Sequence, residues 1–161
     1  MLLSLCLMGN LLAQPATTSG QVAPGRVPVQ FVGDYFRATG LYSQYVLKLE
    51  ETSYVLKSYV DQFSAWSEMG SAELDQHTVI LSPSSKRGPR LLLLARWGDR
   101  RYLVDEQDLG QFCEEAGHGS EPRVWIWGRW FLHDRDETKP VLRGTVPDVC
   151  APMHASEASR Q

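Results

Sequence analysis

The sequence predicts a mainly β (α+β) domain, in which an antiparallel meander of about eight strands forms a small barrel or a curved sheet with one α-helix at about 106–116. Turn-forming residues recur about every 8 to 12 positions, which is the spacing of a meander. The segments between them alternate apolar and polar side chains with a period of two, as strands do. The chain has 161 residues and is 43% hydrophobic, which is enough for one core.

The strand segments follow from this alternation. In residues 41–49, Tyr45, Leu47 and Leu49 share one face and polar side chains dominate the other. Gly70 interrupts a weaker segment and indicates a bulge or a bend. The expected strands are an extended first segment from residue 29 and then 41–49, 53–60, 63–74, 78–81, 91–97, 100–104, 123–133 and 141–146.

A hairpin and a helix form the centre of the prediction. Gly98-Asp99 separates two strands and is a pair that supplies positive φ in a tight loop. Asp105 then occupies a helix N-cap position, with Asp108 three residues on as its capping partner. Gly117 can end the helix in a left-handed conformation, so we expect the helix to span about 106–116.

The ends of the chain differ in composition from the middle. Residues 1–13 are apolar and uncharged and are typical of a signal-peptide core, although no basic residue precedes Arg26; a buried N-terminal strand or helix is the alternative. Residues 14–28 read as a flexible tether, 29–150 as a single β-rich domain and 151–161 as a disordered tail. The chain is therefore expected to be extracytoplasmic, periplasmic or secreted, with no stable membrane span after leader removal.

Charge argues against a nucleic-acid partner. The net charge is −3 and the pI is about 5.8, so no global positive field attracts nucleic acid. Locally, residues 86–101 are basic and 105–121 are acidic. These two blocks are interpreted either as a basic phosphate-binding hairpin beside an acidic segment or as two solvated faces that attract each other.

The most aromatic segment, 123–133, supplies the candidate ligand-binding residues. Alternation places Trp125 and Trp127 with Arg123 and Arg129 on one face, which is typical of an aromatic ligand platform edged by cations. The alternative is a central strand that is buried on both faces, with the helix over one of them. A bulge at Gly128 would change which side chains share a face.

Two cysteines remain after removal of the expected leader. In an exported chain, Cys113 and Cys150 can form a disulfide; the alternatives are two buried free thiols or a nucleophilic Cys113. Nucleophilic, zinc-protease, P-loop and dinucleotide-binding motifs are absent from the sequence, and its four histidines are scattered. No catalytic residue, metal site or cofactor is therefore predicted.

One resemblance adds to these observations. Between residues 33 and 83 the chain contains, in order, GDY, the alternating LKL strand, SYVLKSYV, GSAEL and TVILSP. This order resembles the repeated hairpins of small extracytoplasmic lipocalin-like bacterial proteins, including the N-terminal domain of a copper-stress outer-membrane lipoprotein. The CxxC motif of that lipoprotein is absent here, so its metal and signalling roles do not transfer. The resemblance implies a small secreted β-barrel.

Three classes of function fit these features. The first is a non-enzymatic exported module that binds a small apolar or aromatic ligand, or an envelope protein partner, through the barrel mouth or the Trp-rich strand. The second is a hydrolytic enzyme whose site is assembled from sequence-distant residues. The third is an envelope inhibitor or assembly module that uses an exposed sheet edge. The sequence leaves the oligomeric state open.

Overall fold

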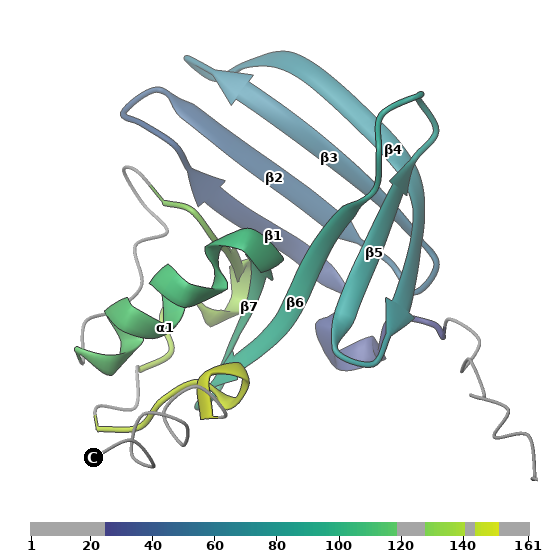
Figure 1. Cartoon of the computed structure of the whole chain (residues 1–161). Coiled ribbons are helices and arrows are strands. Elements are labelled where there is room, and N and C mark those ends of the chain that lie inside the picture. Colours follow the sequence, from purple (N-terminus) through teal and green to yellow (C-terminus); the bar gives the residue numbers. More distant parts are fainter. Residues whose placement is uncertain (1–24, 119–127, 141–143, 152–161) are drawn as a thin grey trace, which may run out of the picture.

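A computed structural model describes residues 25–118, 128–140 and 144–151. Eight antiparallel strands follow one another around a closed barrel, as predicted (Figure 1). The strands are β1 (Gly33–Ala38), β2 (Ser43–Leu49), β3 (Ser53–Val60), β4 (Phe63–Asp75), β5 (Thr78–Pro83), β6 (Arg90–Trp97), β7 (Arg100–Asp105) and β8 (Phe131–His133). The helices are α1 (Leu109–Gly117) and the short 3-10 helices η1 (Val29–Phe31), η2 (Glu106–Asp108), η3 (Asp134–Asp136) and η4 (Asp148–Cys150).

The barrel closes where β8 pairs with both β7 and β1. On β1, Tyr35 lies opposite His133 and Phe36 lies opposite Leu132. Because the strands form a meander, the odd-numbered hairpin connections all lie at one end of the barrel and the even-numbered ones at the other. The loops β1–β2, β3–β4 and β5–β6 define what we call the open end. The opposite, closed end carries η1, which lies below the barrel in Figure 1.

The inward faces of the strands form a packed core toward the closed end. Tyr35, Leu47 and Leu81 have no exposed surface, and Phe31 of η1 is buried against the same cluster. The hydroxyl of Tyr35 donates a hydrogen bond to the Phe31 carbonyl over 2.9 Å, which fixes η1 across the end of the barrel. This half of the barrel is therefore a scaffold rather than a lumen.

A second core lies outside the barrel, between α1 and strands β6 to β8. Trp97, Trp130 and Phe112 are buried there, and the Phe112 and Trp130 rings meet edge to face at 5.2 Å. The predicted disulfide is present in this layer: Cys113 of α1 is bonded to Cys150 of η4. Phe131 and His133 face the barrel core while Trp130 and Leu132 face this layer, so β8 is buried on both faces.

An ion-pair cluster seals the closed end. Asp136 is fully buried and receives hydrogen bonds from Nε and Nη2 of Arg101, at 2.7 and 2.8 Å, and from the Arg101 backbone N–H at 2.9 Å. Lys139 adds a further ion pair to the same carboxylate. Arg101 also donates to the Gln30 carbonyl in η1. Burial alone would raise the pKa of Asp136, but the hydrogen bonds from Arg101 and Lys139 outweigh it and lower the pKa to about 2.

Several sequence expectations hold in detail. Gly98 has φ 62° in the β6–β7 turn, and the Asp105 side chain accepts a hydrogen bond from the Gln107 N–H at the start of η2.

Gly70 has a role other than the predicted bulge, because β4 pairs in unbroken register around it. A Cβ at this position would overlap the Ser82 carbonyl, so glycine permits close approach of β5. The register shift of β4 instead lies near its start, opposite Ser58 and Tyr59.

Other expectations were wrong. Gly117 is helical and not left-handed, and His118 is the C-cap of α1. The predicted strand 141–146 is not a strand over residues 144–146, while 141–143 lie outside the described residues. The physical reason is that β1 already pairs on both sides, so barrel closure leaves no edge there for a ninth strand. At the other end of the chain, the buried Val27 shows that packing against the barrel begins before residue 29.

Candidate functional site

The inward-facing side chains change character toward the open end of the barrel. Toward the closed end these side chains are apolar and buried. At the open end they are aromatic, polar or charged, and we call this second set the mouth. Each member continues the inward register of its strand, as Arg37 does after Tyr35 and Arg90 does before Leu92. The mouth consists of Arg37, Tyr45, Ser58, Trp66, Glu68 and Arg90, with Arg87 above it on the β5–β6 loop.

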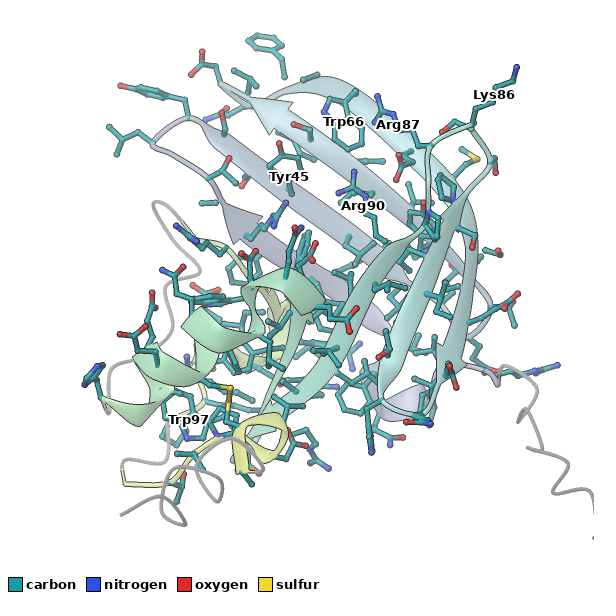
Figure 2. The ribbon with its side chains drawn as sticks, viewed as in Figure 1. Tyr45, Trp66, Lys86, Arg87, Arg90 and Trp97 are labelled. Atoms are coloured by element: carbon teal, nitrogen blue, oxygen red, sulfur yellow. A yellow bond between two sulfur atoms is a disulfide. The ribbon has the colours of Figure 1, made fainter. Side chains whose placement is uncertain are left out.

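Two aromatic rings form one wall of the mouth. Tyr45 of β2 and Trp66 of β4 are partly buried, and their ring centroids are 6.0 Å apart with planes inclined by 62°. Figure 2 shows both rings on the wall formed by β2, β3 and β4, with Arg87 and Arg90 on the side nearer β6. The guanidinium of Arg87 lies 5.8 Å from the centre of the Trp66 ring. The wall can therefore receive a flat apolar group by edge or face contact.

A buried carboxylate lies beside this wall. The Glu68 side chain is 6% exposed, and its oxygens lie 3.5 Å from Nη1 of Arg87 and 3.6 Å from Nε of Arg90. The hydroxyl of Tyr54 donates a hydrogen bond to the same carboxylate over 3.0 Å. Burial, together with that hydrogen bond, raises the pKa of Tyr54 to about 12. Glu68 therefore has three partners and holds Arg87 and Arg90 at the mouth.

Arg37 differs from these two arginines. Its Cζ lies 4.8 Å from the Tyr45 ring centre and 4.6 Å from that of Phe131, so the guanidinium is held between two aromatic rings. Nη1 donates to the Arg129 carbonyl over 2.9 Å, and the buried Nε has no hydrogen-bond partner among the described residues. Burial lowers the pKa of Arg37, and the positive charge of Arg90 lowers it further.

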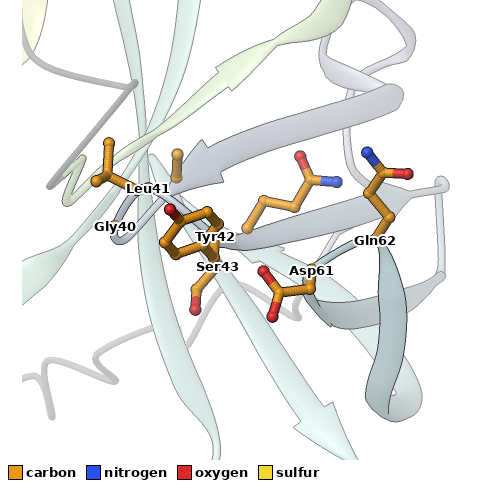
Figure 3. Close-up of a pocket in the computed structure, with 8 residues that line it drawn as sticks. Gly40, Leu41, Tyr42, Ser43, Asp61 and Gln62 are labelled. Atoms are coloured by element: carbon orange, nitrogen blue, oxygen red, sulfur yellow. The ribbon is translucent and has the colours of Figure 1, made fainter.

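Three shallow pockets surround the mouth at the rim. One of about 540 Å³ lies between the β1–β2 loop and the β3–β4 turn and is lined by Leu41, Tyr42 and Gln62 among others (Figure 3). A second, of about 420 Å³, includes Trp66 and Glu68. The third, of about 540 Å³, is lined by residues of the β6 start and the β7 end, including Arg90 and Asp105. The open end is therefore hollowed at several points.

The tips of two adjacent hairpins at this rim carry exposed apolar side chains. Leu41, Tyr42 and Phe63 are 71%, 70% and 78% exposed, and Val60 is 43% exposed. The Asp61 N–H donates to the Tyr42 carbonyl over 2.9 Å, so the two tips are joined. Clustered exposed apolar side chains of this kind are common at interaction surfaces.

The predicted platform residues are only partly visible. Arg123, Trp125 and Trp127 lie outside the described residues. The side chain of Arg129 lies at the protein surface, where it donates to Gln111 Oε1 over 2.5 Å and lies 3.9 Å from Asp108. Arg129 therefore contacts η2 and α1 through its side chain and the mouth only through its carbonyl, which accepts from Arg37.

The mouth residues themselves were not predicted, although the sequence contains a signal for them. Arg37 and Glu68 are charged side chains on the inward face of strands that carry buried apolar residues on the same face. Arg37 follows the buried Tyr35 by two positions, and Glu68 precedes the buried Ala72 by four. A charge on the inward register of a barrel strand is unusual and indicates an internal polar site. What the sequence could not give was which strands face each other across the barrel.

Other sites raised by the sequence find less support. Cys113 is disulfide-bonded and has no free thiol with which to act as a nucleophile. Glu114 lies in α1, but His118 follows the end of the helix, and the described part of the chain contains no group of three residues suited to hold a metal ion. Among the same residues, no helix is both long enough and apolar enough to cross a membrane.

Comparisons with known proteins add no family. No family model matches the chain, and neither the curated proteins nor the solved structures give a match. The eight-stranded antiparallel barrel is compatible with the lipocalin-like resemblance seen in the sequence.

Proposed function

We propose that this protein is an exported, lipocalin-like, non-enzymatic binding module that takes a small aromatic or apolar ligand at the mouth of its barrel. The observation that carries the proposal is the partly buried Tyr45 and Trp66 pair at the open end of a barrel whose other end is sealed. The packed core and the Asp136 cluster beneath the mouth form a rigid base. Rigid support of this kind holds binding side chains in place before the ligand arrives.

The charges of the mouth favour binding over hydrolysis. Acid–base catalysis needs a group that gains or loses a proton near the working pH. The Glu68 carboxylate is occupied by Tyr54, Arg87 and Arg90. Tyr54, with a pKa of about 12, remains protonated at neutral pH. The hydrolytic alternative would require a different set of groups.

The proposed location outside the cytoplasm rests on two features. The apolar uncharged residues 1–13 precede a Pro-, Gly- and Ser-containing segment, and the barrel carries a disulfide. Disulfides persist mainly in oxidising compartments. We expect mass spectrometry of the exported protein to give a mature N-terminus between about residues 14 and 29; an intact Met1 would contradict export by a cleaved leader.

A fluorescence titration tests the binding proposal. N-phenyl-1-naphthylamine is an uncharged aromatic probe that becomes fluorescent in an apolar site. We expect it to bind the wild-type protein and to lose roughly two- to tenfold in affinity in Trp66→Leu, because stacking on one aromatic ring contributes about 0.5 to 1.5 kcal/mol beyond area burial. The matched control is Tyr59→Leu, since Tyr59 lies on the outward face of β3. Equal binding by wild type and Trp66→Leu would contradict the proposed site.

A protein partner docked on the rim is the second candidate, favoured by the exposed tips. Replacing Leu41 and Phe63 together with serine removes most of that apolar surface without touching the Tyr45 and Trp66 pair. Photo-crosslinking from a probe at residue 62 in an envelope extract would show a discrete crosslinked product that the double variant loses. A product pattern unchanged in the variant would exclude docking through the tips.

A further inference from the structure

We propose that the ligand of the mouth carries an acidic group beside its aromatic or apolar part, and that Arg37 is the counter-charge that binds this group. The inference rests on the proposed function and specifies its ligand class as an aromatic organic acid. The distribution of charges in the mouth, the contacts of Arg37 and the position of Tyr45 support it.

The mouth contains more positive charge than its buried carboxylate can neutralise. Arg87 and Arg90 both lie within 3.6 Å of Glu68, so one carboxylate already serves two guanidinium groups. Arg37 adds a third positive charge near enough for the charge of Arg90 to act on it. Like charges placed together in a partly buried site repel each other, and an anionic ligand relieves that repulsion.

The two carboxylates that act on Arg37 electrostatically, Asp105 and Asp108, have other partners. Asp105 accepts the hydrogen bond from the Gln107 N–H that starts η2, and Asp108 lies 3.9 Å from Arg129. Both act on Arg37 electrostatically, but within the described residues Arg37 forms no ion pair closer than 4.0 Å. Its charge is therefore held in the mouth without a direct counter-ion from this part of the protein.

The contacts of Arg37 hold its guanidinium in place and leave donors free. The rings of Tyr45 and Phe131 hold the group at 4.8 and 4.6 Å, and the Arg129 carbonyl takes one hydrogen bond from Nη1. A guanidinium has five N–H donors. The Nε donor is enclosed and has no partner among the described residues, and Nη2 donates no hydrogen bond to them, so the free donors lie at the end of the side chain. A planar fork with unused donors is suited to a carboxylate or sulfonate.

Tyr45 joins the charged and the aromatic parts of the mouth. One side of its ring contacts Arg37 and the same ring lies 6.0 Å from that of Trp66. A ligand whose ring lies against Trp66 and Tyr45 would therefore bring an attached acidic group toward Arg37. Because the Arg37 guanidinium lies only 4.8 Å from the Tyr45 ring centre, the acidic group would be attached directly to, or close to, the aromatic ring system of the ligand.

Two fluorescent probes that differ by one acidic group test this inference. 1-Anilinonaphthalene-8-sulfonate has the ring system of N-phenyl-1-naphthylamine with a sulfonate added. We expect the wild-type protein to bind the sulfonate about tenfold more tightly, a difference of about 1.4 kcal/mol, because a hydrogen bond to a charged group adds to binding. In Arg37→Gln we expect the preference for the sulfonate to be lost, so that the ratio of the two probe affinities falls from about ten to about one.

The matched control is Arg96→Gln, which removes the same charge from an exposed position near the closed end of β6. This variant should keep the preference for the sulfonate. Near-UV circular dichroism checks that each variant is folded, since the sulfonate probe also binds loosened cores. If Arg37→Gln does not fold, the wild-type protein alone decides: its affinity for the sulfonate, but not for the neutral probe, should fall as salt rises from 50 to about 500 mM.

The possible outcomes separate the two proposals. Equal affinity of Arg37→Gln and wild type for the sulfonate, with the neutral probe still bound and still weakened in Trp66→Leu, would overturn the role of Arg37 and leave the proposed binding function intact. Failure of both probes to bind the wild-type protein would overturn both. A sulfonate preference that is lost in Arg37→Gln and kept in Arg96→Gln would support both.

Discussion

The two ends of this barrel surround their partly buried arginines with different partners. At the closed end, Arg101 meets the fully buried Asp136 with two side-chain hydrogen bonds, at 2.7 and 2.8 Å, and the carboxylate has further partners besides. At the open end, Arg37 has aromatic rings on two sides and one carbonyl, with no ion pair among the described residues. Both side chains face inward on the same barrel.

The difference suits the closed end to stabilising the fold and the open end to binding a ligand. A buried ion pair with all partners present becomes expensive to break, because removing one partner leaves the other charge buried and unpaired. A partly buried charge without a counter-ion contributes little to stability, and such a group in a cleft is a candidate for a functional site. The predictions below test this contrast between the Asp136 cluster and the mouth.

The largest effect is expected from Asp136→Ala. The substitution would leave Arg101 buried without its carboxylate and release η1 and η3 from each other. We expect the free energy of unfolding to fall by about 3 to 5 kcal/mol, measured by urea denaturation. Asp75→Asn, at an exposed position at the end of β4, is the control and should change it by less than about 0.5 kcal/mol. A small loss in Asp136→Ala would show that the closed end is not held by this cluster.

The next effect concerns the outer layer. The disulfide joins α1 to η4 across a sequence separation of 37 residues. We expect Cys113→Ala together with Cys150→Ala to reduce the free energy of unfolding by roughly 3 to 4 kcal/mol in the chain-entropy account. Because this layer lies outside the barrel, neutral-probe binding at the mouth should persist under conditions where the variant is folded. Stoichiometric alkylation of both thiols in the unreduced wild-type protein would show instead that they are not paired.

Acid should weaken the closed end in two stages. Burial lowers the pKa of His133 below its ordinary 6.5, so the folded protein binds this proton less well than the unfolded chain. Stability is therefore lost as the pH falls below about 6.5. The pKa of Asp136 is about 2 against an ordinary 3.8, so its contribution is present above about pH 4 and is lost toward pH 2, amounting to roughly 2 kcal/mol.

Measuring the free energy of unfolding from pH 8 to pH 2 checks both stages. In Asp136→Asn the second stage should be missing, because the amide does not titrate. In His133→Gln the first should be missing. A wild-type protein whose stability is flat between pH 7 and pH 3 would contradict the assignment of these two groups.

The sequence predicted the local features of this fold well. Alternation around Leu47, the turn at Gly98 and the cap at Asp105 depend on neighbouring residues and were visible without a structure. The predicted disulfide needed only the count of cysteines and the compartment. The predicted strand 123–133 is confirmed only in part: Phe131–His133 is a strand buried on both faces, residues 128–130 are not a strand, and 123–127 lie outside the described residues.

The candidate site could not be predicted in the same way. Its members come from β1, β2, β3, β4 and β6, and their proximity depends on barrel closure, which no local pattern specifies. The Trp-rich segment drew attention because aromatic density is visible in a sequence, whereas Arg37 and Glu68 are single charges in otherwise ordinary strands. The predicted strand 141–146 is absent over the described residues 144–146 for the same reason, since barrel closure removes the edge on which it would have paired.

Among these variants, Arg37→Gln is expected to change stability least, although it is proposed to change binding of an acidic ligand most. Arg37→Gln removes two ring contacts, each worth about 0.5 to 1 kcal/mol at an exposed site, and a hydrogen bond of about 1 kcal/mol. It also removes a partly buried charge and its repulsion from Arg90, and this relief opposes the loss. We expect the free energy of unfolding to change by less than about 1 kcal/mol, several times less than in Asp136→Ala. Urea denaturation of the two variants side by side makes the comparison, and a loss of 3 kcal/mol or more in Arg37→Gln would mean that both ends of the barrel use arginine for stability.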